Sequence, residues 1–131
     1  MTLQDVSHGM INWSELMTTD PARARAFYGE LLGWTFEDYP SCGCQYAIVK
    51  VGERVIGGIM DMPPEALELG APPNWGCYIT VDDVDVTVDK AKALGAQAII
   101  EPRNIPEVGR FAVIRDPQGA VISFISYGMV R

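Results

Sequence analysis

Alternating hydrophobic and polar positions give way to a helical spacing twice along this chain. Residues 9–18 are mostly apolar with polar interruptions, which predicts a strand. Asp20 then stands where a helix N-cap is expected, with Pro21 at the first helical position and Gly33 as a stop signal. The apolar residues between them have the spacing of one buried helix face: Ala24, Phe27, Tyr28, Leu31 and Leu32.

Three extended segments follow the first helix, at residues 34–39, 44–51 and 54–62. Gly52-Glu53 between the last two predicts a tight hairpin turn. Gly57-Gly58 indicates a bulge or a close backbone approach. Residues 63–73 are rich in proline and interrupt the pattern, so we expect a linker there.

The second half of the chain repeats this order. Residues 75–81 predict a strand, and Asp82 or Asp83 caps a helix that Gly95 ends. The buried side of that helix is expected to carry Val84, Val88, Ala91 and Leu94. Extended segments follow at 96–104, 110–116 and 120–127, with the turn sequence DPQG at 116–119 between the last two.

Each half therefore has the order β-α-β-β-β, and both copies open with Asn-Trp, at residues 12–13 and 74–75. We predict an α+β fold in which two tandem modules, about 9–62 and 74–127, share one core in a single domain of residues 1–131. At 131 residues with 48% hydrophobic side chains, the chain is long enough for such a core.

Charge and composition disfavour several classes of function. The 10 basic and 17 acidic side chains give a net charge of −7 without a Lys/Arg cluster, which argues against nucleic-acid binding. No apolar run approaches the ~20 residues that span a bilayer, and the N-terminus does not resemble a secretory signal. The cysteine count of 3 is too low for a disulfide framework, so we expect a cytoplasmic protein.

The two modules carry motifs of a known family. Asp20, Phe27-Tyr28 and Leu32-Gly33, together with DPQGAVISF at 116–124, resemble the vicinal oxygen chelate superfamily of glyoxalases, bleomycin-resistance proteins and dioxygenases. The resemblance spans about residues 9–127. It implies a glyoxalase/bleomycin-resistance-like domain in which curved mixed sheets form a cleft. In the metal-dependent members, metal ligands project into that cleft.

The positions where this resemblance implies metal ligands hold other residues. The histidine of the first module falls on Trp13, that of the second on Trp75 or Gly76, and the last carboxylate on Ser123. The only histidine, His8, precedes the first strand. Because divalent metals of this family prefer imidazole and carboxylate ligands, we expect no bound metal and no other cofactor.

The three cysteines are a second possible metal site. Cys42 and Cys44 form a C-x-C pair, and Cys77 lies on another predicted strand. Zinc sites use four ligands and pairs separated by two to four residues. Small buried thiols therefore explain these cysteines better.

Without a metal, the cleft is either an aromatic pocket or a filled core. Strand alternation puts Trp13, Glu15 and Met17 on one face, and large aromatic rings can stack on a ligand or simply close a cavity. Both interpretations stay open. The residues expected to bind a ligand are Trp13, Glu15, Tyr46, Met60, Trp75, Tyr78, Arg110, Phe111 and Ser123.

Arg110 and Glu15 each allow a functional and a plain interpretation. Arg110 could hold a ligand carboxylate at the mouth of the cleft, but a surface pair with Glu107 or Asp116 explains it more simply. Glu15 could act as a general base if burial raises its pKa. A solvent-facing carboxylate is the simpler interpretation.

Two functions from different classes remain. The first is a metal-independent protein that binds a small aromatic or amphipathic molecule, similar to the bleomycin-resistance branch. The second is an enzyme of the superfamily, a lyase, isomerase, dioxygenase or hydroxylase of unknown substrate. The missing ligands favour the first. We also expect a homodimer, because an open sheet leaves an apolar face to be covered and the resemblance implies such dimers.

Overall fold

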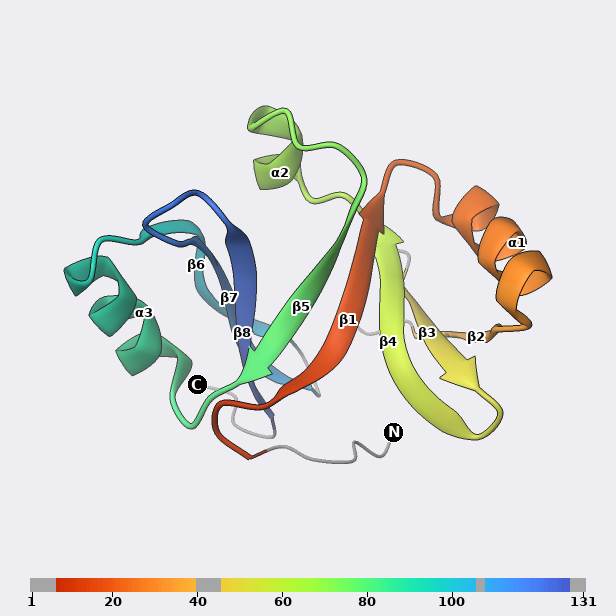
Figure 1. Ribbon diagram of the computed structural model, residues 1–131, viewed down its shortest axis with the longest axis horizontal. Helices are drawn as coiled ribbons and strands as arrows, with labels where there is room; N and C mark the ends of the chain where they lie inside the picture. The colour runs from red at the N-terminus through yellow and green to blue at the C-terminus, as the bar shows by residue number, and fades with distance from the viewer. Residues whose placement is uncertain (1–6, 40–45, 106–107, 128–131) are drawn as a thin grey trace. The chain divides into compact units, whose positions relative to one another are not determined.

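The structure, a computed structural model, describes residues 7–39, 46–105 and 108–127, which form a mixed α+β fold (Figure 1). The elements in chain order are β1 (Ile11–Thr18), α1 (Pro21–Leu32), β2 (Thr35–Asp38), β3 (Tyr46–Val51), β4 (Arg54–Asp61), α2 (Pro64–Glu68), β5 (Asn74–Thr80), α3 (Val84–Ala93), β6 (Gln97–Ile105), β7 (Gly109–Arg115) and β8 (Val121–Tyr127). This order confirms the predicted β-α-β-β-β repeat. Among the described residues, no helix is both long and apolar enough to span a membrane.

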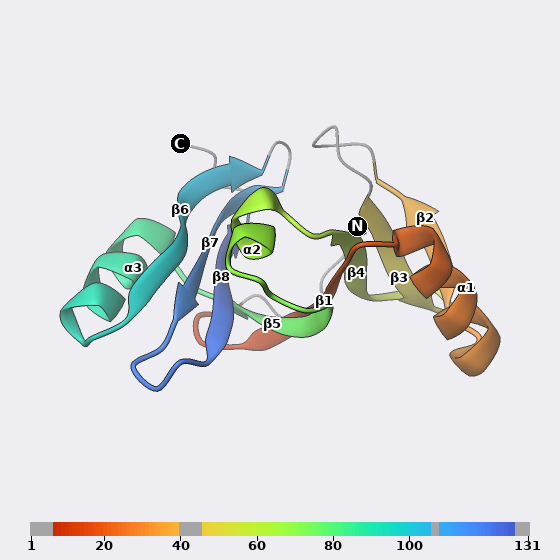
Figure 2. The same cartoon turned by 90° about the horizontal axis from the view of Figure 1, so that it is seen from above.

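The described residues divide into two compact units. The first unit contains residues 13–76, and the second contains residues 7–12 and 77–127. Strand order is β2-β3-β4-β1 in the first unit and β5-β8-β7-β6 in the second. β1 runs parallel to β4 and β5 parallel to β8, while the other pairs are antiparallel. Figure 2 shows α1 and α3 each beside the strands of its own unit.

Helix α1 begins and ends as the sequence predicts. The Asp20 carboxylate accepts the Arg23 N–H at 3.1 Å, and Gly33 has a left-handed φ of 74°. Ala24 and Tyr28 of this helix pack on a buried cluster of the strands beneath it. That cluster consists of Leu16, Ala47, Val49 and Ile59.

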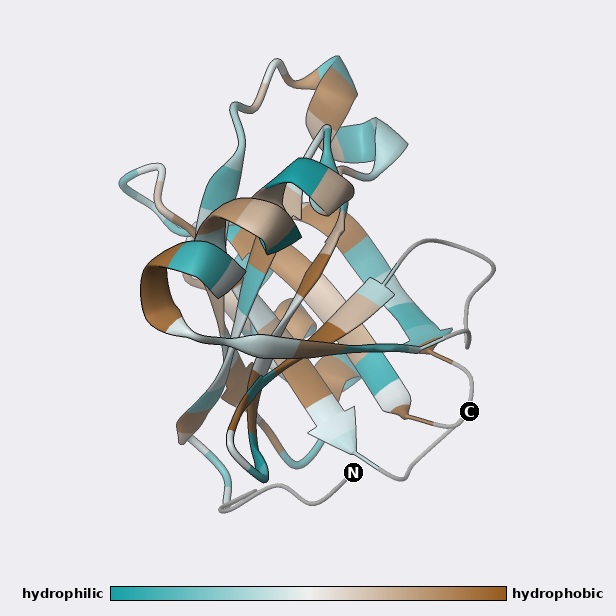
Figure 3. Ribbon diagram, turned by 90° about the vertical axis from the view of Figure 1, so that its right-hand side faces the viewer, coloured by the Kyte–Doolittle hydropathy of each residue, from teal (hydrophilic) through white to brown (hydrophobic). Residues whose placement is uncertain are grey.

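The predicted buried face of α1 is wrong for three residues. Phe27, Leu31 and Leu32 are each more than half exposed. The aromatic rings of Trp34 and Phe36, which follow the helix, pack on the core cluster instead. Figure 3 accordingly shows both hydrophobic and hydrophilic turns along α1.

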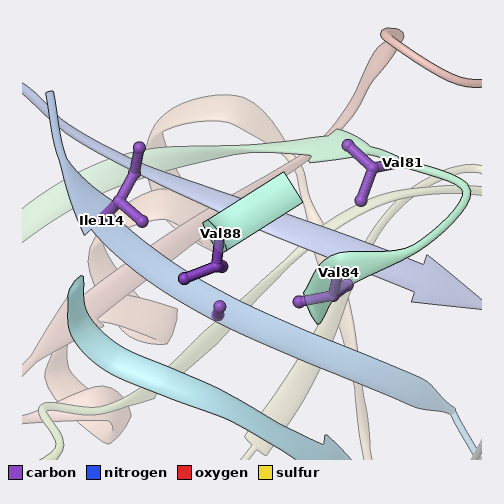
Figure 4. Packing of buried hydrophobic residues seen from close by; sticks show 5 residues of the cluster. Val81, Val84, Val88 and Ile114 are labelled. Atoms are coloured by element: carbon purple, nitrogen blue, oxygen red, sulfur yellow. The ribbon is translucent and has the colours of Figure 1, made fainter. Parts of the chain in front are cut away.

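The second unit has its own core between α3 and its strands. Val81, Val84, Val88, Ala112 and Ile114 form a buried cluster (Figure 4), on which Ala91 also packs. Asp83, not Asp82, caps α3 by accepting the Val86 N–H at 3.1 Å. Leu94 is exposed rather than buried, since the helix ends at Ala93 and Leu94 is its C-cap.

The predicted turns are confirmed, and the predicted linker is only partly irregular. Gly52 has a φ of 60° in the hairpin between β3 and β4, and the Gly119 N–H donates to the Asp116 carbonyl at 2.9 Å in the DPQG turn. A Cβ on Gly57 would collide with the Ser14 carbonyl oxygen, so the close backbone approach is confirmed. The linker contains the short helix α2, because Pro64 suits a first helical position.

Candidate functional site

The strands of the first unit have one face under α1 and one face opposite α1. Leu16 of β1 and Ile59 of β4 belong to the cluster beneath α1. Successive side chains alternate between faces, so Trp13 and Glu15 point the other way. Tyr46 stands opposite Met60 in the β3–β4 register, and Gly58 stands opposite Glu15 in the β4–β1 register. The face opposite α1 therefore brings together four predicted ligand-binding residues: Trp13, Glu15, Tyr46 and Met60.

Three of these side chains form a chain of hydrogen bonds. The Trp13 indole Nε1–H donates to Tyr46 Oη at 3.0 Å, and the Tyr46 hydroxyl donates to Glu15 Oε2 at 2.7 Å. Trp13 is 7% exposed and Glu15 4% exposed. The interpretation of Glu15 as a solvent-facing carboxylate is therefore wrong, because this side chain is buried and accepts a hydrogen bond from Tyr46.

Gly58 makes room for this arrangement. A Cβ at this position would collide with the hydroxyl and ring carbons of Tyr46. Because glycine has no side chain, the phenol can lie against the β4 backbone and reach Glu15 on β1. The sequence showed the glycine pair but not which ring uses the space.

The second unit has a comparable face opposite α3. Ile122 and Phe124 of β8 pack toward the α3 core, so Ser123 between them points the other way. Tyr78 is the parallel partner of Ser123, and both are buried. Phe111 shares this face by alternation with Ala112, which lies in the core under α3. Three further predicted residues, Tyr78, Phe111 and Ser123, thus share one face of the second unit.

Arg103 is a residue on this second face that sequence reasoning missed. It stands opposite Phe111 in the β6–β7 register, with its guanidinium carbon 6.0 Å from the centre of the Phe111 ring. This is a cation–π distance. The alternation of β6 could have suggested it, but the irregular register of that strand hides the pattern.

Arg110 lies on the face of β7 that α3 covers. Its Nε and Nη2 donate to the Asp85 carboxylate at 2.6 and 2.9 Å, and Nη1 donates to Asn104 Oδ1 at 3.0 Å. The hydrogen bonds to Asp85 raise the pKa of Arg110 above its ordinary value. The predicted partner Asp116 instead accepts the backbone N–H groups of its own turn, and Glu107 lies outside the described residues.

Trp75 lies apart from the Trp13 face. Its indole N–H donates to Tyr28 Oη at 3.0 Å, and its ring meets those of Tyr28 and Trp34 edge to face at 5.4 and 5.8 Å. Tyr28 belongs to α1 and packs on the core beneath it. Trp13 and Trp75 stand at the start of the two copies of the repeat but contact different residues, Tyr46 and Tyr28.

Residues 10–124 match the family model described as Glyoxalase/Bleomycin resistance protein/Dioxygenase superfamily. The chain belongs to this superfamily. The resemblance seen in the motifs is confirmed.

Two proteins similar in sequence to this chain support the assignment to the superfamily. The Mycobacterium tuberculosis (strain CDC 1551 / Oshkosh) protein named "Putative glyoxylase CFP32" is 43% identical over 118 residues, 89% of this chain and 44% of that protein. The "Anthracycline biosynthesis protein DauV" of Streptomyces sp. (strain C5) is 31% identical over 117 residues, 89% of this chain and 41% of that protein. The chain thus spans less than half the length of these relatives.

Solved structures share the fold at low sequence identity. Protein BH1468 from Bacillus halodurans C-125 superposes with a TM-score of 0.65 and 19% identity, covering 95% of this chain and 99% of that chain. A Streptomyces coelicolor methylmalonyl-CoA epimerase in complex with 2-nitronate-propionyl-CoA gives 0.63 and 16%, covering 93% and 99%. These similarities confirm the predicted α+β fold of the superfamily.

The residues at the superfamily's metal positions do not fit a divalent ion. Trp13 offers an indole N–H that donates to Tyr46, and Ser123 offers a hydroxyl. Neither replaces the imidazole or carboxylate that such ions prefer. Within residues 7–39, 46–105 and 108–127, no three His, Cys, Asp or Glu side chains gather as a metal site would require.

Cys77 does not share the face of Tyr78 and Ser123 described above. Cys42 and Cys44 fall outside the described residues. Cys77 is exposed, so its interpretation as a buried thiol is wrong; it alternates with the buried Tyr78 on β5. His8 Nδ1 accepts the Asp82 backbone N–H at 3.0 Å.

Proposed function

We propose that this domain binds a small molecule with an aromatic or amphipathic body and does so without a metal ion of its own. The face opposite α1 in the first unit is the proposed contact surface. The observation that carries the proposal is the hydrogen-bonded chain of Trp13, Tyr46 and Glu15 on that face. Its side chains are an indole, a phenol and a carboxylate, flanked by the Met60 thioether opposite Tyr46.

This combination has the chemistry of a small-molecule site. Such sites are mostly apolar and aromatic, with a few polar groups that fix the ligand's orientation. Trp13 and Tyr46 supply stacking surface, and Met60 supplies an adaptable wall. Glu15 supplies a polar group whose position Tyr46 fixes through a 2.7 Å hydrogen bond.

Not every residue expected to bind a ligand belongs to this proposal. Trp75 and Arg110 lie on the helix-covered sides of their units, and their polar groups are engaged by Tyr28 and Asp85. Tyr78, Phe111 and Ser123 share a face of the second unit and are retained as a separate candidate contact surface. The proposed primary surface is therefore the one around Trp13.

A relative's name supports an aromatic ligand. DauV is named for anthracycline biosynthesis, and anthracyclines are planar polycyclic aromatic compounds. Bleomycin resistance is part of the superfamily's description. We propose an aromatic ligand for this chain on these grounds together with the side chains on the face opposite α1.

Tryptophan fluorescence tests the proposal. Titrating the protein with doxorubicin, a planar anthracycline, is expected to quench part of the emission. Trp13→Phe should weaken binding about ten-fold or more, since it removes both the indole surface and the donor to Tyr46. Trp75→Phe is the matched control and should leave the affinity unchanged.

Two results would contradict the proposal. Equal affinity in wild type and Trp13→Phe would remove Trp13 from the binding surface. A stoichiometric metal ion in the purified protein, measured by elemental analysis and required for binding, would contradict metal independence.

The pair of buried Glu15 and half-buried Tyr46 also favours a second candidate, an enzyme that uses acid–base catalysis. A carboxylate that is 4% exposed and 2.7 Å from a hydroxyl is suitably placed to move a proton. The name of CFP32 contains the word glyoxylase. Turnover of the hemithioacetal of methylglyoxal and glutathione, lost in Glu15→Gln, would favour this candidate over binding alone.

We retain the homodimer and the cytoplasmic location as proposals. Exposed apolar side chains on the first unit, including Phe27 and Leu31, support association with a second copy. Sedimentation at micromolar concentration tests this, because a mass of one chain would contradict a dimer.

A further inference from the structure

We propose that Met17 and Met60 form an adjustable wall beside the fixed rings of Trp13 and Tyr46, so that the site accepts planar aromatic molecules of more than one size and outline. This inference rests on the proposed function and names the breadth of its ligand class. It follows from the strand register, from the hydrogen bonds that hold the two rings and from the flexibility of methionine.

The strand register places the two methionines side by side on the proposed contact surface. Met17 of β1 and Met60 of β4 are partners in the parallel β1–β4 register, and paired strands lie about 4.8 Å apart. Met17 follows Trp13 and Glu15 at every second position of β1, so the three side chains share a face. Met60 is also the partner of Tyr46 in the antiparallel β3–β4 register. The two thioethers therefore lie next to the rings, on the face opposite α1.

Hydrogen bonds hold the rings of this surface in place. The Trp13 indole donates to Tyr46 Oη at 3.0 Å, and the Tyr46 hydroxyl donates to Glu15 Oε2 at 2.7 Å. Trp13 is only 7% exposed, and the Tyr46 ring lies against Gly58. Turning either ring to suit a ligand would break a hydrogen bond away from water, which is costly. A ligand must therefore fit these rings in their present orientation.

The methionine side chains can move at a lower cost. Methionine is unbranched and has three rotatable side-chain bonds, so it fills gaps of irregular shape. Met17 and Met60 are both half-buried, so each is partly accessible to a ligand. The face of β3 and β4 beneath α1 instead carries Val49 and Ile59, which are almost completely buried and whose branching restricts χ1. The flexible side chains thus lie on the face proposed to bind the ligand.

Breadth of binding follows from this division into fixed rings and a flexible wall. A hydrophobic pocket discriminates by about 10-fold to 200-fold between ligands that differ by one methylene group. A methionine wall lowers this discrimination, because it repacks around each ligand as in proteins that bind many partners. The thioether sulfur also interacts favourably with aromatic rings. We therefore expect ligands that share a planar aromatic core and differ in the number and arrangement of their rings.

Three neutral probes with one polar group test the breadth. We would measure binding of 1-naphthalenemethanol, 9-anthracenemethanol and 1-pyrenemethanol by the change in their own fluorescence. The wild-type protein is expected to bind all three, and neither larger ring system more weakly than naphthalene. A rigid site shaped to the smallest probe would exclude the larger ones.

Isoleucine substitutions test whether the two methionines are responsible. The double variant Met17→Ile/Met60→Ile has side chains of similar volume whose branching restricts χ1. It should bind 1-pyrenemethanol about ten-fold or more weakly than wild type does, and 1-naphthalenemethanol within about two-fold. Met10→Ile is the matched control, because Met10 is 43% exposed in the second unit, and it should change neither affinity. Circular dichroism would establish that both variants are folded.

Norleucine separates the flexibility of methionine from the chemistry of its sulfur. Protein produced with norleucine in place of methionine keeps unbranched side chains and lacks the sulfur, so it should still bind all three probes. In the wild-type protein, the ε-methyl NMR signals of Met17 and Met60 should shift with each probe. Unchanged signals would contradict the inference without any need for a variant that folds.

The outcomes separate this inference from the proposed function. If the wild-type protein binds 1-naphthalenemethanol and excludes the larger probes, or if the isoleucine variant keeps all three affinities, the adjustable wall is wrong while aromatic binding stands. A norleucine protein that loses the larger probes would also contradict the inference, since flexibility would not be the cause. If none of the three probes nor doxorubicin binds, both the inference and the proposed function are wrong.

Discussion

The phenol ring of Tyr46 lies against Gly58, in the space that any larger residue would fill. Tyr46 extends from β3 across β4 at this glycine to reach Glu15 on β1, where its hydroxyl donates at 2.7 Å. The missing side chain at Gly58 therefore permits a hydrogen bond that spans three strands. A buried carboxylate acquires a fixed position because of a glycine on the strand beside it.

Gly58→Ala should displace Tyr46 while the strands stay paired, because the collision is with a side chain that can rotate away. Loss of the Tyr46 hydrogen bonds should lower the free energy of unfolding by about 1–3 kcal/mol. The indole N–H resonance of Trp13 should shift in a ¹H–¹⁵N NMR spectrum. Tyr46→Phe is the matched variant and should move the same resonance, whereas an unchanged resonance in both would contradict the hydrogen-bond chain.

Gly57→Ala should lower the free energy of unfolding more than Gly58→Ala does. A methyl group at Gly57 would collide with the backbone carbonyl of Ser14, and backbone cannot rotate away. β1 and β4 would have to separate at this point, with a cost of about 3 kcal/mol. Chemical denaturation of the two glycine variants checks the ranking, and equal midpoints for Gly57→Ala and wild type would refute the close approach.

Local signals in the sequence predicted most of the fold. Each of these signals involves only a few neighbouring residues, so the sequence alone is enough to predict it. Examples are the N-cap at Asp20, the left-handed Gly33 and the DPQG turn. The exposed faces of Phe27 and Leu31 were missed because burial depends on what packs nearby. Trp34 and Phe36 take that part of the core, which helical spacing alone does not reveal.

The sequence predicted the part of the candidate site that depends on local alternation, and it did not predict contacts between distant elements. Alternation along β1 put Trp13 and Glu15 on one face, and the strand register adds Tyr46 and Met60 to them. The partner of Arg110 could not be predicted, because Asp85 lies 25 residues away on α3. Pairing across elements requires the register, which the sequence pattern does not contain.

Val88→Ala should destabilise the second unit, and Val86→Ala should not. Val88 is 1% exposed in the α3 core (Figure 4), so removing two methyl groups leaves a cavity that costs about 2 kcal/mol. Val86 lies on the same helix but is 63% exposed. Thermal unfolding compares the two, and similar losses in both would contradict the core assigned to α3.

Asp83→Ala should lower the free energy of unfolding by about 1 kcal/mol, because its carboxylate accepts the Val86 N–H at the start of α3. Asp82→Ala should have little effect, since that side chain is exposed and its contact with His8 spans 3.6 Å. Urea denaturation of both variants distinguishes the two aspartates. A larger loss of stability for Asp82→Ala than for Asp83→Ala would contradict the assignment of Asp83 as the N-cap.

Glu37 on β2 should titrate below its ordinary value. The hydrogen bond from Lys50 and the lysine's charge lower the pKa of Glu37, and the same pair raises the pKa of Lys50. The stability due to the lowered pKa of Glu37 is present above its ordinary pKa of 4.5 and is lost as the pH falls through its folded value. The part due to Lys50 is complete below 10.5 and is lost as the pH rises through the raised pKa.

Lys50→Gln should therefore return the Glu37 pKa toward its ordinary value. The pKa is measured by following the NMR signal of the Glu37 side-chain carboxyl carbon as the pH changes. The stability difference between this variant and wild type should be constant near neutral pH and shrink in acid. Lys92→Gln is the control, because Lys92 pairs with Glu101 at 3.0 Å in the second unit. A Glu37 titration that is the same in wild type and Lys50→Gln would show that the 2.6 Å contact between Lys50 and Glu37 does not persist in solution.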